Sequence, residues 1–423
     1  MIPTRVPTWS RPAIVPALLA SLTLVAGGAT AATTAPPTAP ATASSVATAA
    51  STIERGDFAR RRYRTPLAGV CPNPIVVQKD WLIQSEHGAL YQLIGGAGRM
   101  SRGRYEGPLG STGIDLLVLE GGRGIGLGDA ETAYSALYMG NSKAGVVPHL
   151  AFHDLDNAFI FSSRFPTVSV VALLDKSPSV LLWDRATYPK GFHSLADLSA
   201  FASSGKGKIY VSTTKRTFGR YLLSQGIPKD AFMEGFRGDG ETFVINNGTW
   251  LNQGAVTNEV YQFEHGFNWR KPIDYVLVSD LGYDIYPSMV AVATSRLEEL
   301  APCLAKLVPL LQQAQVDYVS DPREVNDLIV RFADAKMAAP FWKMSAALVE
   351  NAVKVQRATG LVGNGSNQTL GDFDLRRVAG LLAQIRGSLD VRAKQGVTPE
   401  DVVTNRFIDP RIGLQPATGG PSQ

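Results

Sequence analysis

The sequence predicts an α/β protein of two lobes, with the first lobe discontinuous in the chain and a helical C-terminal region. Short apolar runs at 75–77, 114–120 and 168–174 predict buried strands. They alternate with helix-like segments, which is the pattern of a parallel or mixed sheet. From residue 295 onwards leucines recur at helical spacing, so a long apolar helix must cover another surface. The first strands offer that surface, and 423 residues suffice for two lobes.

A second α/β part is predicted between the first strands and the leucine-rich segment. It begins with a helix start that resembles a capping box, and a strand at 208–212 follows. The segment 217–225 is predicted to be helical because glycine and proline end it. Apolar runs at 243–245 and 275–278 predict further strands.

The first residues, 1–31, are predicted to be a secretory signal peptide. A basic start with Arg5 and Arg11 precedes the apolar run 13–26, and the small residues 29–31 suit a signal peptidase. The alternative is a transmembrane anchor, but the run is shorter than the roughly 20 residues that a spanning helix needs. We therefore expect an exported protein that is soluble after signal cleavage, in the periplasm or the cell-wall zone.

Residues 32–65 are predicted to be a flexible linker, and residues 411–423 a disordered tail. The linker begins with a stretch of almost only Ala, Thr, Pro and Ser, which cannot bury enough surface to offset its ordering entropy. Its basic stretch at 60–64 is expected to be solvated, the alternative being contact with acidic wall polymers or anionic lipid head groups.

The net charge argues against one class of partner, and the two cysteines indicate a disulfide. A formal net charge of +4 is small for this length and does not indicate a nucleic-acid partner, which would need concentrated Lys and Arg. Cys71 and Cys303 are the two cysteines of the chain, and in an exported protein they are expected to form a disulfide. The alternative is two buried free thiols.

A run at 80–91, DWLIQSEHGALY, resembles the first ligand loop of one branch of the periplasmic solute-binding proteins. This branch of the type II periplasmic binding protein superfamily includes binding proteins for thiamine pyrimidine precursors, and its relatives bind sulfonates, nitrate and taurine. Further matches keep the family's order along the chain. They are LEGG at 119–122, VSVVALL at 168–174, FHSLADL at 192–198, VTNEVYQFE at 256–264, DLGY at 280–283 and Tyr286.

The resemblance implies the substrate-binding protein of an ABC transporter. Its first lobe would comprise residues 66–176 and 276–410, and its second lobe residues 177–275. Two crossing strands would join the lobes, and a small-molecule ligand would lie in the cleft between them. The protein would deliver this ligand to a membrane permease with an attached ATPase. We expect a monomer that uses no cofactor, holds no metal and is not an enzyme.

The expected ligand-binding residues come from loops at strand ends, where α/β folds place ligands. Aromatic rings in the first loop can stack on a flat ligand, its Glu and His offer polar recognition, and glycines in the second loop let backbone N–H groups approach the ligand. The predicted set is Trp81, Glu86, His87, Tyr91, Gly121, Gly122, Thr214, Lys215, Asn258, Glu259 and Tyr283. The aromatic and carboxylate groups favour a nitrogen heterocycle such as a pyrimidine, whereas Lys215 and the glycines would suit a sulfonate or another anion.

Two other classes of function remain open. Ser212 and Lys215 form an S-x-x-K pattern, which is the nucleophile motif of penicillin-recognising enzymes. The pattern occurs again at Ser203 and Lys206, and no K-T-G sequence supports it, so a serine acyl-enzyme is the weaker hypothesis. The other alternative is a ligand-sensing module of the same fold that works without a transporter.

Two further patterns are not expected to bind a nucleotide cofactor or a metal ion. The glycine-rich segment 121–128 lacks the G-x-G-x-x-G spacing of a dinucleotide site. His149 and His153 have the four-residue spacing of a helical metal site, but Pro148 and the apolar neighbours do not suit a helix.

Overall fold

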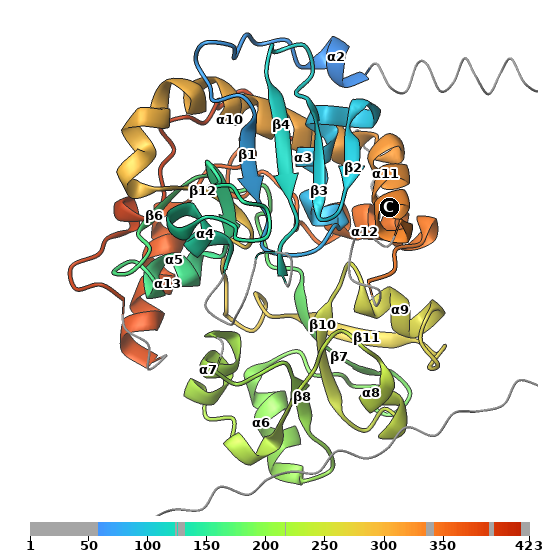
Figure 1. Cartoon of the computed structure of the whole chain (residues 1–423). Coiled ribbons are helices and arrows are strands. Elements are labelled where there is room, and N and C mark those ends of the chain that lie inside the picture. Colours follow the sequence, from blue (N-terminus) through green and yellow to red (C-terminus); the bar gives the residue numbers. More distant parts are fainter. Residues whose placement is uncertain are drawn as a thin grey trace, which may run out of the picture. The chain divides into compact units, whose positions relative to one another are not determined.

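The computed structural model describes residues 58–122, 125, 132–215, 217–335, 342–388 and 393–415 (Figure 1). All of them belong to one unit, Thr48–Gln423. The predicted signal peptide and most of the predicted linker lie outside the described residues. Within the described part, no helix is both long enough and apolar enough to cross a membrane.

The first sheet has seven strands in the order β2-β3-β4-β1-β5-β12-β6. Four of them, β1, β5, β12 and the last strand β6, are buried along their whole length because helices cover both faces of the sheet, which explains their continuous apolar runs. The strands are β1 (Ile75–Gln78), β2 (Arg99–Ser101), β3 (Arg104–Pro108), β4 (Asp115–Leu119), β5 (Leu150–His153), β6 (Thr167–Val171) and β12 (Met289–Ala293).

The second sheet has five strands in the order β11-β7-β10-β8-β9. They are β7 (Ser179–Asp184), β8 (Ile209–Val211), β9 (Phe232–Glu234), β10 (Leu251–Ala255) and β11 (Ile273–Leu277). Successive side chains of β7 enter different hydrophobic clusters, as the two-residue period of a strand requires. Leu181 and Trp183 pack with helices α6 (Leu195–Ser204) and α7 (Thr217–Ser224), whereas Val180 and Leu182 pack with α8 (Glu241–Ile245) and α9 (Glu259–His265).

Both sheets share one pattern of strand directions. Three parallel strands, β4-β1-β5 or β9-β8-β10, are followed by one antiparallel strand, β12 or β7, and then by a strand antiparallel to that one, β6 or β11. Strand β12 completes the first sheet although it follows every strand of the second sheet in the chain. The predicted α/β class is therefore confirmed: the structure has two α/β lobes, a first lobe that is discontinuous in the chain, and a helical C-terminal region.

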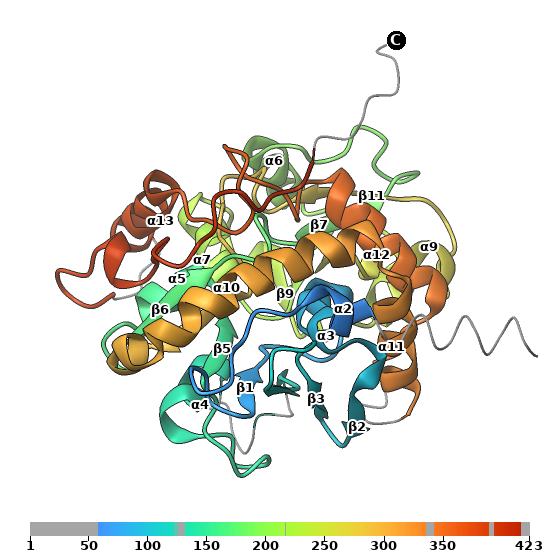
Figure 2. The same cartoon turned by 90° about the horizontal axis from the view of Figure 1, so that it is seen from above.

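The C-terminal helices cover the first sheet, as the leucine spacing predicts. The long helix α10 (Leu297–Ser320) packs across α3 (Gly88–Ile94), as Figure 2 shows, and Gly88 is required there because an added Cβ would lie 2.1 Å from the Tyr318 ring. Helices α11 (Arg323–Asp334) and α12 (Ala346–Ala358) continue this layer. The remaining helices are α2 (Phe58–Arg62), α4 (Ala133–Met139), α5 (Leu155–Ile160) and α13 (Leu375–Ser388).

The segment 243–245, predicted as a strand, is instead the end of helix α8. Phe243 is buried against Phe263 and Trp269, but Ile245 is 80% exposed. Only one side of this short segment is covered, and three apolar residues are too few to reveal a helical period in the sequence.

The predicted linker ends earlier than residue 65. Helix α2 packs its Ala59 against the first lobe, and Tyr63 is fully buried with its hydroxyl donating to Asp317 at 3.0 Å. Arg62, expected to be solvated, forms an ion pair with the same carboxylate at 2.8 Å. The Asp317 carboxylate on α10 thus anchors the first residues of the fold. No local pattern in the predicted linker reveals this contact.

The predicted disordered tail likewise begins later than residue 411. Leu370 N donates to Ile412 O at 2.9 Å, and the Asn364 side chain exchanges two hydrogen bonds with the backbone of Leu414. Residues 411–414 are therefore part of the fold.

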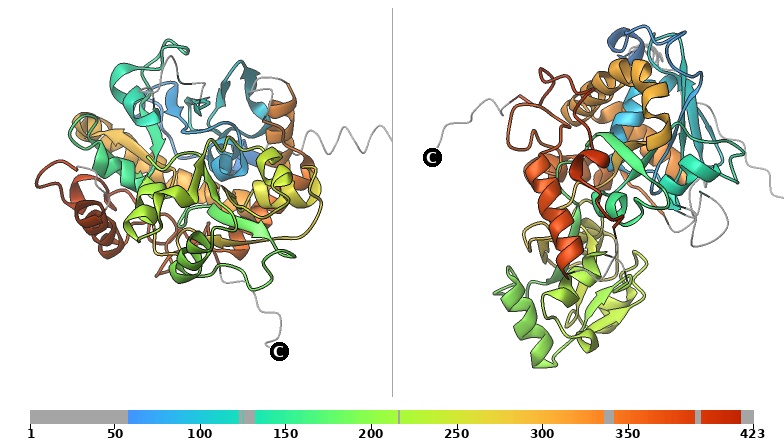
Figure 3. Two further views of the ribbon diagram at one scale, coloured as in Figure 1. Left: turned by 90° about the horizontal axis from the view of Figure 1, so that it is seen from below. Right: turned by 90° about the vertical axis from the view of Figure 1, so that its left-hand side faces the viewer.

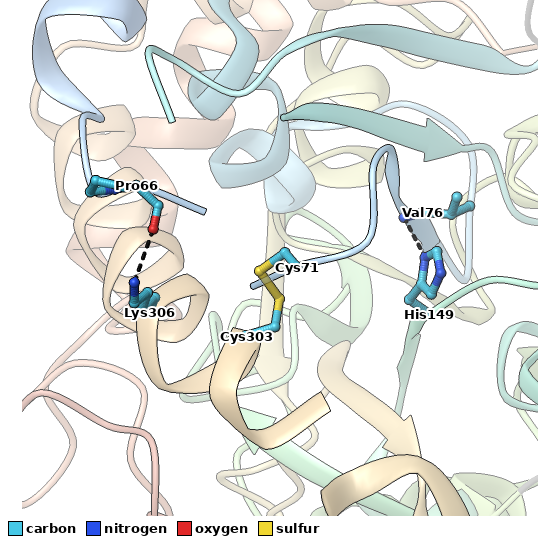
Figure 4. Close-up of a disulfide and its surroundings, with 6 residues drawn as sticks. All are labelled: Pro66, Cys71, Val76, His149, Cys303 and Lys306. Atoms are coloured by element: carbon cyan, nitrogen blue, oxygen red, sulfur yellow. Dashed lines mark hydrogen bonds between the residues drawn. A yellow bond between two sulfur atoms is a disulfide. The ribbon is translucent and has the colours of Figure 1, made fainter. Parts of the chain in front are cut away.

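The predicted disulfide is present and joins Cys71, just before β1, to Cys303 on α10 (Figure 4). The two residues are 232 positions apart in the sequence. Lys306, one turn further along α10, donates a hydrogen bond to Pro66 O at 3.2 Å. The start of the first lobe is thus linked to a helix that follows the second lobe in the sequence.

Candidate functional site

Polar residues follow the strands of the first sheet at one edge. Strands β1, β4 and β5 are parallel, so their carboxyl ends lie together at this edge, and the amino end of antiparallel β12 joins them. The residues placed there include Lys79, Asp80, Glu120, His153 and Ser288. This edge is where an α/β lobe offers side chains to a ligand.

Asp80 organises the first loop after β1. One carboxylate oxygen pairs with His87 Nε2 at 2.9 Å, and the other accepts from Ser288 Oγ at 2.5 Å. Burial opposes ionisation of Asp80, but His87 and Ser288 outweigh it and hold the pKa of the carboxyl below its usual value. The His87 ring is fully buried and lies edge-on to Phe152 at 5.2 Å. His87 therefore orders the loop from within.

A buried charged group lies behind this loop. Lys79 is fully buried, and its Nζ has no hydrogen-bond partner among the described residues. Burial lowers the pKa of Lys79 to about 8, against the attraction of Glu120 and Asp80. Its ammonium lies 5.2 Å from the centre of the Tyr91 ring. Tyr91, predicted to contact ligand, is 1% exposed and faces Lys79 and Tyr105 within the first lobe.

The predicted glycines connect the second loop to the first. Gly121 N donates to Trp81 O and Gly122 N donates to Asp80 O, both at 2.9 Å. A Cβ on Gly121 would lie 2.2 Å from the carbonyl carbon of Asp80, and Gly122 has a φ of +57°. In this structure these N–H groups are bound to protein carbonyls, and the glycines allow the two loops to approach each other.

The corresponding edge of the second sheet holds Thr214 and Lys215. Thr214 N donates to Glu234 Oε1 at 2.8 Å, and its hydroxyl donates to the same oxygen. These bonds, above all that of the Thr214 side chain, lower the pKa of Glu234. Lys215 is exposed, and its backbone N–H donates to Thr213 Oγ1 at 3.1 Å. The edge therefore presents one carboxylate and one lysine to solvent.

Asn258 and Glu259 follow β10 at the same edge of the second sheet. Glu259 is 6% exposed, and its carboxylate accepts from Ala255 N at 2.7 Å. Burial raises the pKa of Glu259 to about 7, and the negative charge of Glu86 adds to this effect. Asn258 Oδ1 is buried without a hydrogen-bond partner in the described part of the chain. Both residues add acceptors to this edge.

The edges of the two sheets meet at a hydrogen bond between Glu86 and Thr257. Thr257 Oγ1 donates to Glu86 Oε1 at 2.5 Å, across 171 positions of sequence. Both residues are buried, at 2% and 5% exposure. Glu86 belongs to the first loop, in the short 3-10 helix η1 (Ser85–His87), and Thr257 lies two residues before the start of α9. The structure thus brings Glu86 of the first lobe near Glu259 of the second.

Tyr283, also predicted to bind ligand, lies in the crossing region. It is 2% exposed, its hydroxyl donates to Asp156 at 2.6 Å, and its ring packs 5.3 Å from that of Tyr221. The structure therefore brings together Trp81, Glu86, Gly121 and Gly122 in the first lobe, and Asn258 and Glu259 in the second. It places Tyr91 and Tyr283 inside packed clusters.

Three residues that the sequence-based prediction did not include lie at these edges. Asp80 was detectable, since it directly follows a buried strand and precedes the aromatic of the loop. Thr257 lies in the segment 256–264, which resembles the solute-binding family, but nothing in that segment distinguishes it from its neighbours. Trp342 contacts the first loop from the C-terminal region, with Nε1 donating to Ile83 O at 2.7 Å, and no local pattern indicates this contact.

The histidines 149 and 153 have separate structural contacts. His149 Nδ1 accepts from Val76 N at 3.0 Å (Figure 4), and His153 Nε2 lies 3.0 Å from Thr167 Oγ1. Burial lowers the pKa of His153 to about 4. Among the described residues, no group of three or more His, Cys, Asp or Glu side chains could hold a metal ion.

We predict that replacing Glu259 by glutamine changes how stability depends on pH. A carboxyl whose pKa is raised from 4.5 to about 7 keeps its proton in the folded state after the unfolded state has lost it. Its contribution is most favourable below pH 4.5 and falls, by roughly 3 kcal/mol in total, as the pH rises to 7. The variant should therefore gain stability relative to the parent between pH 5 and 8.

Urea unfolding at several pH values tests this prediction. The exposed Glu241, also in the second lobe, supplies the control variant Glu241→Gln, which should follow the parent at each pH. Parallel curves for the parent and for Glu259→Gln across this range would show that Glu259 ionises normally.

Comparisons with known proteins add the following. No family model matches the chain, and no curated protein matches it. Among solved structures it is similar to the periplasmic nitrate-binding protein NrtA of Synechocystis PCC 6803, at 12% identity over 80% of this chain and 88% of that one, with a TM-score of 0.49. It is also similar to a zinc-bound ligand-binding component of an ABC-type import system from Staphylococcus aureus, at 11% identity, covering 79% and 98%, with a TM-score of 0.47. The periplasmic aliphatic sulphonate binding protein SsuA of Escherichia coli gives 9% identity, 84% and 97% coverage, and a TM-score of 0.45.

Proposed function

We propose that this protein is an exported solute-binding protein that captures a small organic molecule between its two lobes and delivers it to the permease and ATPase of an ABC importer. The observation that carries the proposal is the meeting of the two sheet edges at Glu86 and Thr257. Each edge is formed by the carboxyl ends of three parallel strands, the usual place of ligands in α/β folds.

The connection between the lobes suits a hinge. The chain crosses from β6 to β7 at 172–178 and returns from β11 to β12 at 278–288. Two crossing segments allow the lobes to rotate while each sheet stays intact, and closure around a ligand would exclude water from that ligand. A permease can then distinguish the closed, loaded form from the open form.

The charges at the site favour a neutral or cationic nitrogen heterocycle, such as a pyrimidine, as the ligand. Glu86 and Glu259 come from opposite lobes, and Asn258 Oδ1 adds an acceptor that has no hydrogen-bond partner among the residues that the structure describes. Hydrogen-bond acceptors and carboxylates attract donor groups and repel anions. Lys215, which would favour a sulfonate, is exposed beside the carboxylate of Glu234. The resemblance of the first loop to the thiamine-precursor branch supports the same choice.

A thermal-shift panel tests the proposal on the mature protein. A small aminopyrimidine should raise the melting temperature, because a ligand at a hundred times its Kd adds about 2.7 kcal/mol to the stability of the folded state. An alkylsulfonate and nitrate should have no comparable effect. Stabilisation by the sulfonate alone would refute the choice of ligand class but retain capture between the lobes. No stabilisation by any small molecule, together with none carried through native purification, would refute the proposed function.

The serine acyl-enzyme is not favoured. Ser212 and Lys215 are both described, and no hydrogen bond joins their side chains in the structure; Ser212 is held by its backbone N–H, which donates to Gln253 at 2.9 Å. Covalent labelling by a fluorescent penicillin that disappears in Ser212→Ala would instead support the acyl-enzyme. A sensing module that works without a transporter would bind ligand but would not stimulate ATP hydrolysis by a permease–ATPase complex.

A further inference from the structure

Trp81 is the most accessible aromatic residue of the first loop. It is 40% exposed, although its neighbours Leu82 and Ile83 are buried. Gly122 packs against its six-membered ring, since a Cβ there would lie 3.3 Å from Trp81 Cε3. The loop therefore presents an indole ring that one glycine supports and that solvent reaches.

Trp342 fixes this ring from another part of the chain. The two indole rings lie with their centres 6.1 Å apart and their planes at 80°, an edge-to-face arrangement. Trp342 is itself held by the hydrogen bond from its Nε1 to Ile83 O, at 2.7 Å, and packs against the core of the first lobe. Trp342, which precedes helix α12, thus fixes both the position of the Ile83 carbonyl in the first loop and the orientation of the Trp81 ring.

We propose that Trp342 is a specificity-determining positioning residue, which holds Trp81 as a platform on which a flat, conjugated ring of the ligand stacks. The inference rests on the proposed function and extends it to one feature of the ligand. Offset stacking on an indole ring of fixed orientation favours ligand rings that are planar and conjugated, and a positive charge on the ligand ring strengthens the attraction further. A saturated ring with the same donors would make the same polar contacts but could not stack.

Affinities for a small aminopyrimidine and for its saturated ring analogue, measured by calorimetry, test this inference. In Trp342→Ala the aminopyrimidine should bind about tenfold more weakly, whereas binding of the saturated analogue should change by less than about twofold. Trp342→Phe, which keeps an aromatic edge but loses the N–H bond, should recover part of the selectivity. Trp81→Ala should show the full loss of selectivity.

Trp250 supplies the matched control. It is partly buried beside Tyr210, at a ring distance of 6.4 Å, and precedes β10 at the opposite end of the strand from Asn258. Trp250→Ala should leave both affinities unchanged. Parent-like selectivity in Trp342→Ala, or an equal loss for both compounds, would overturn the inference and leave the proposed function standing. Failure of the parent to prefer the flat ring would also overturn it, whereas the proposed function fails only if no small molecule binds.

Discussion

Replacing Arg377 by alanine should lower the free energy of unfolding by about 3 kcal/mol, because it leaves a partly buried carboxylate without its counter-charge. Arg377 Nη1 binds Asp175 Oδ1 at 2.9 Å, and Nη2 binds Asp284 Oδ1 at 2.6 Å. Asp175 lies on the first crossing segment and Asp284 on the second. One guanidinium on α13, the red helix in the right-hand view of Figure 3, therefore ties both crossings together.

The contact is reinforced in ways that lysine could not reproduce. Arg377 also donates to the carbonyls of Asp175 and Ile285, and its guanidinium lies 3.9 Å from the centre of the Tyr286 ring. A planar fork with several donors suits this arrangement, whereas an ammonium could serve only part of it. Arg377→Lys should therefore recover less than half of the lost stability.

Arg376 provides the control on the same helix. Its side chain is 93% exposed, so Arg376→Ala should change stability by no more than about 0.5 kcal/mol. Urea unfolding of the three variants measures these differences. Equal midpoints for Arg377→Ala and Arg376→Ala would show that the clamp across the crossings contributes nothing to the folded state.

The second large effect is expected at the disulfide. Removing the bond between Cys71 and Cys303 frees a loop of 232 positions in the unfolded chain. The chain-entropy relation gives about 5 kcal/mol for a loop of this length, as an upper value. The double variant Cys71→Ser/Cys303→Ser should accordingly unfold at markedly lower urea than the oxidised parent.

Reductant supplies the control for this prediction. It should lower the urea midpoint of the parent to that of the double variant and should leave the variant itself unchanged. Coincident unfolding curves for the oxidised parent and the variant would show that α10 holds the start of the first lobe equally well without the covalent bond.

The parts of the fold that follow from local patterns were predictable from the sequence. The run 114–120 is a buried strand because helices cover both faces of its sheet, and the leucines from residue 297 form a helix that needs such a sheet. The anchoring of Tyr63 by Asp317 was not predictable, since it joins a short basic segment to a helix more than half the chain away. The helix at 241–245 was not predictable either: its apolar residues 243–245 suggest a strand, because five residues are too few to show a helical period.

For the site, proximity to a strand end was the useful signal. It located the loop with Trp81 and Glu86 and the segment with Asn258 and Glu259, which the structure brings to two meeting edges. It could not exclude Tyr91, whose ring turns into the lobe, because the direction of a helical side chain depends on what packs above it. It also could not find Trp342, whose role arises only from tertiary contact.

Native mass spectrometry of the protein purified without denaturation tests capture between the lobes most directly. One small molecule of defined mass per chain is expected. This molecule should be lost in the double variant Trp81→Ala/Asn258→Ala, which removes one incompletely buried side chain from each edge, and retained in Trp250→Ala. The same bound mass at full occupancy in the double variant would contradict capture between the lobes.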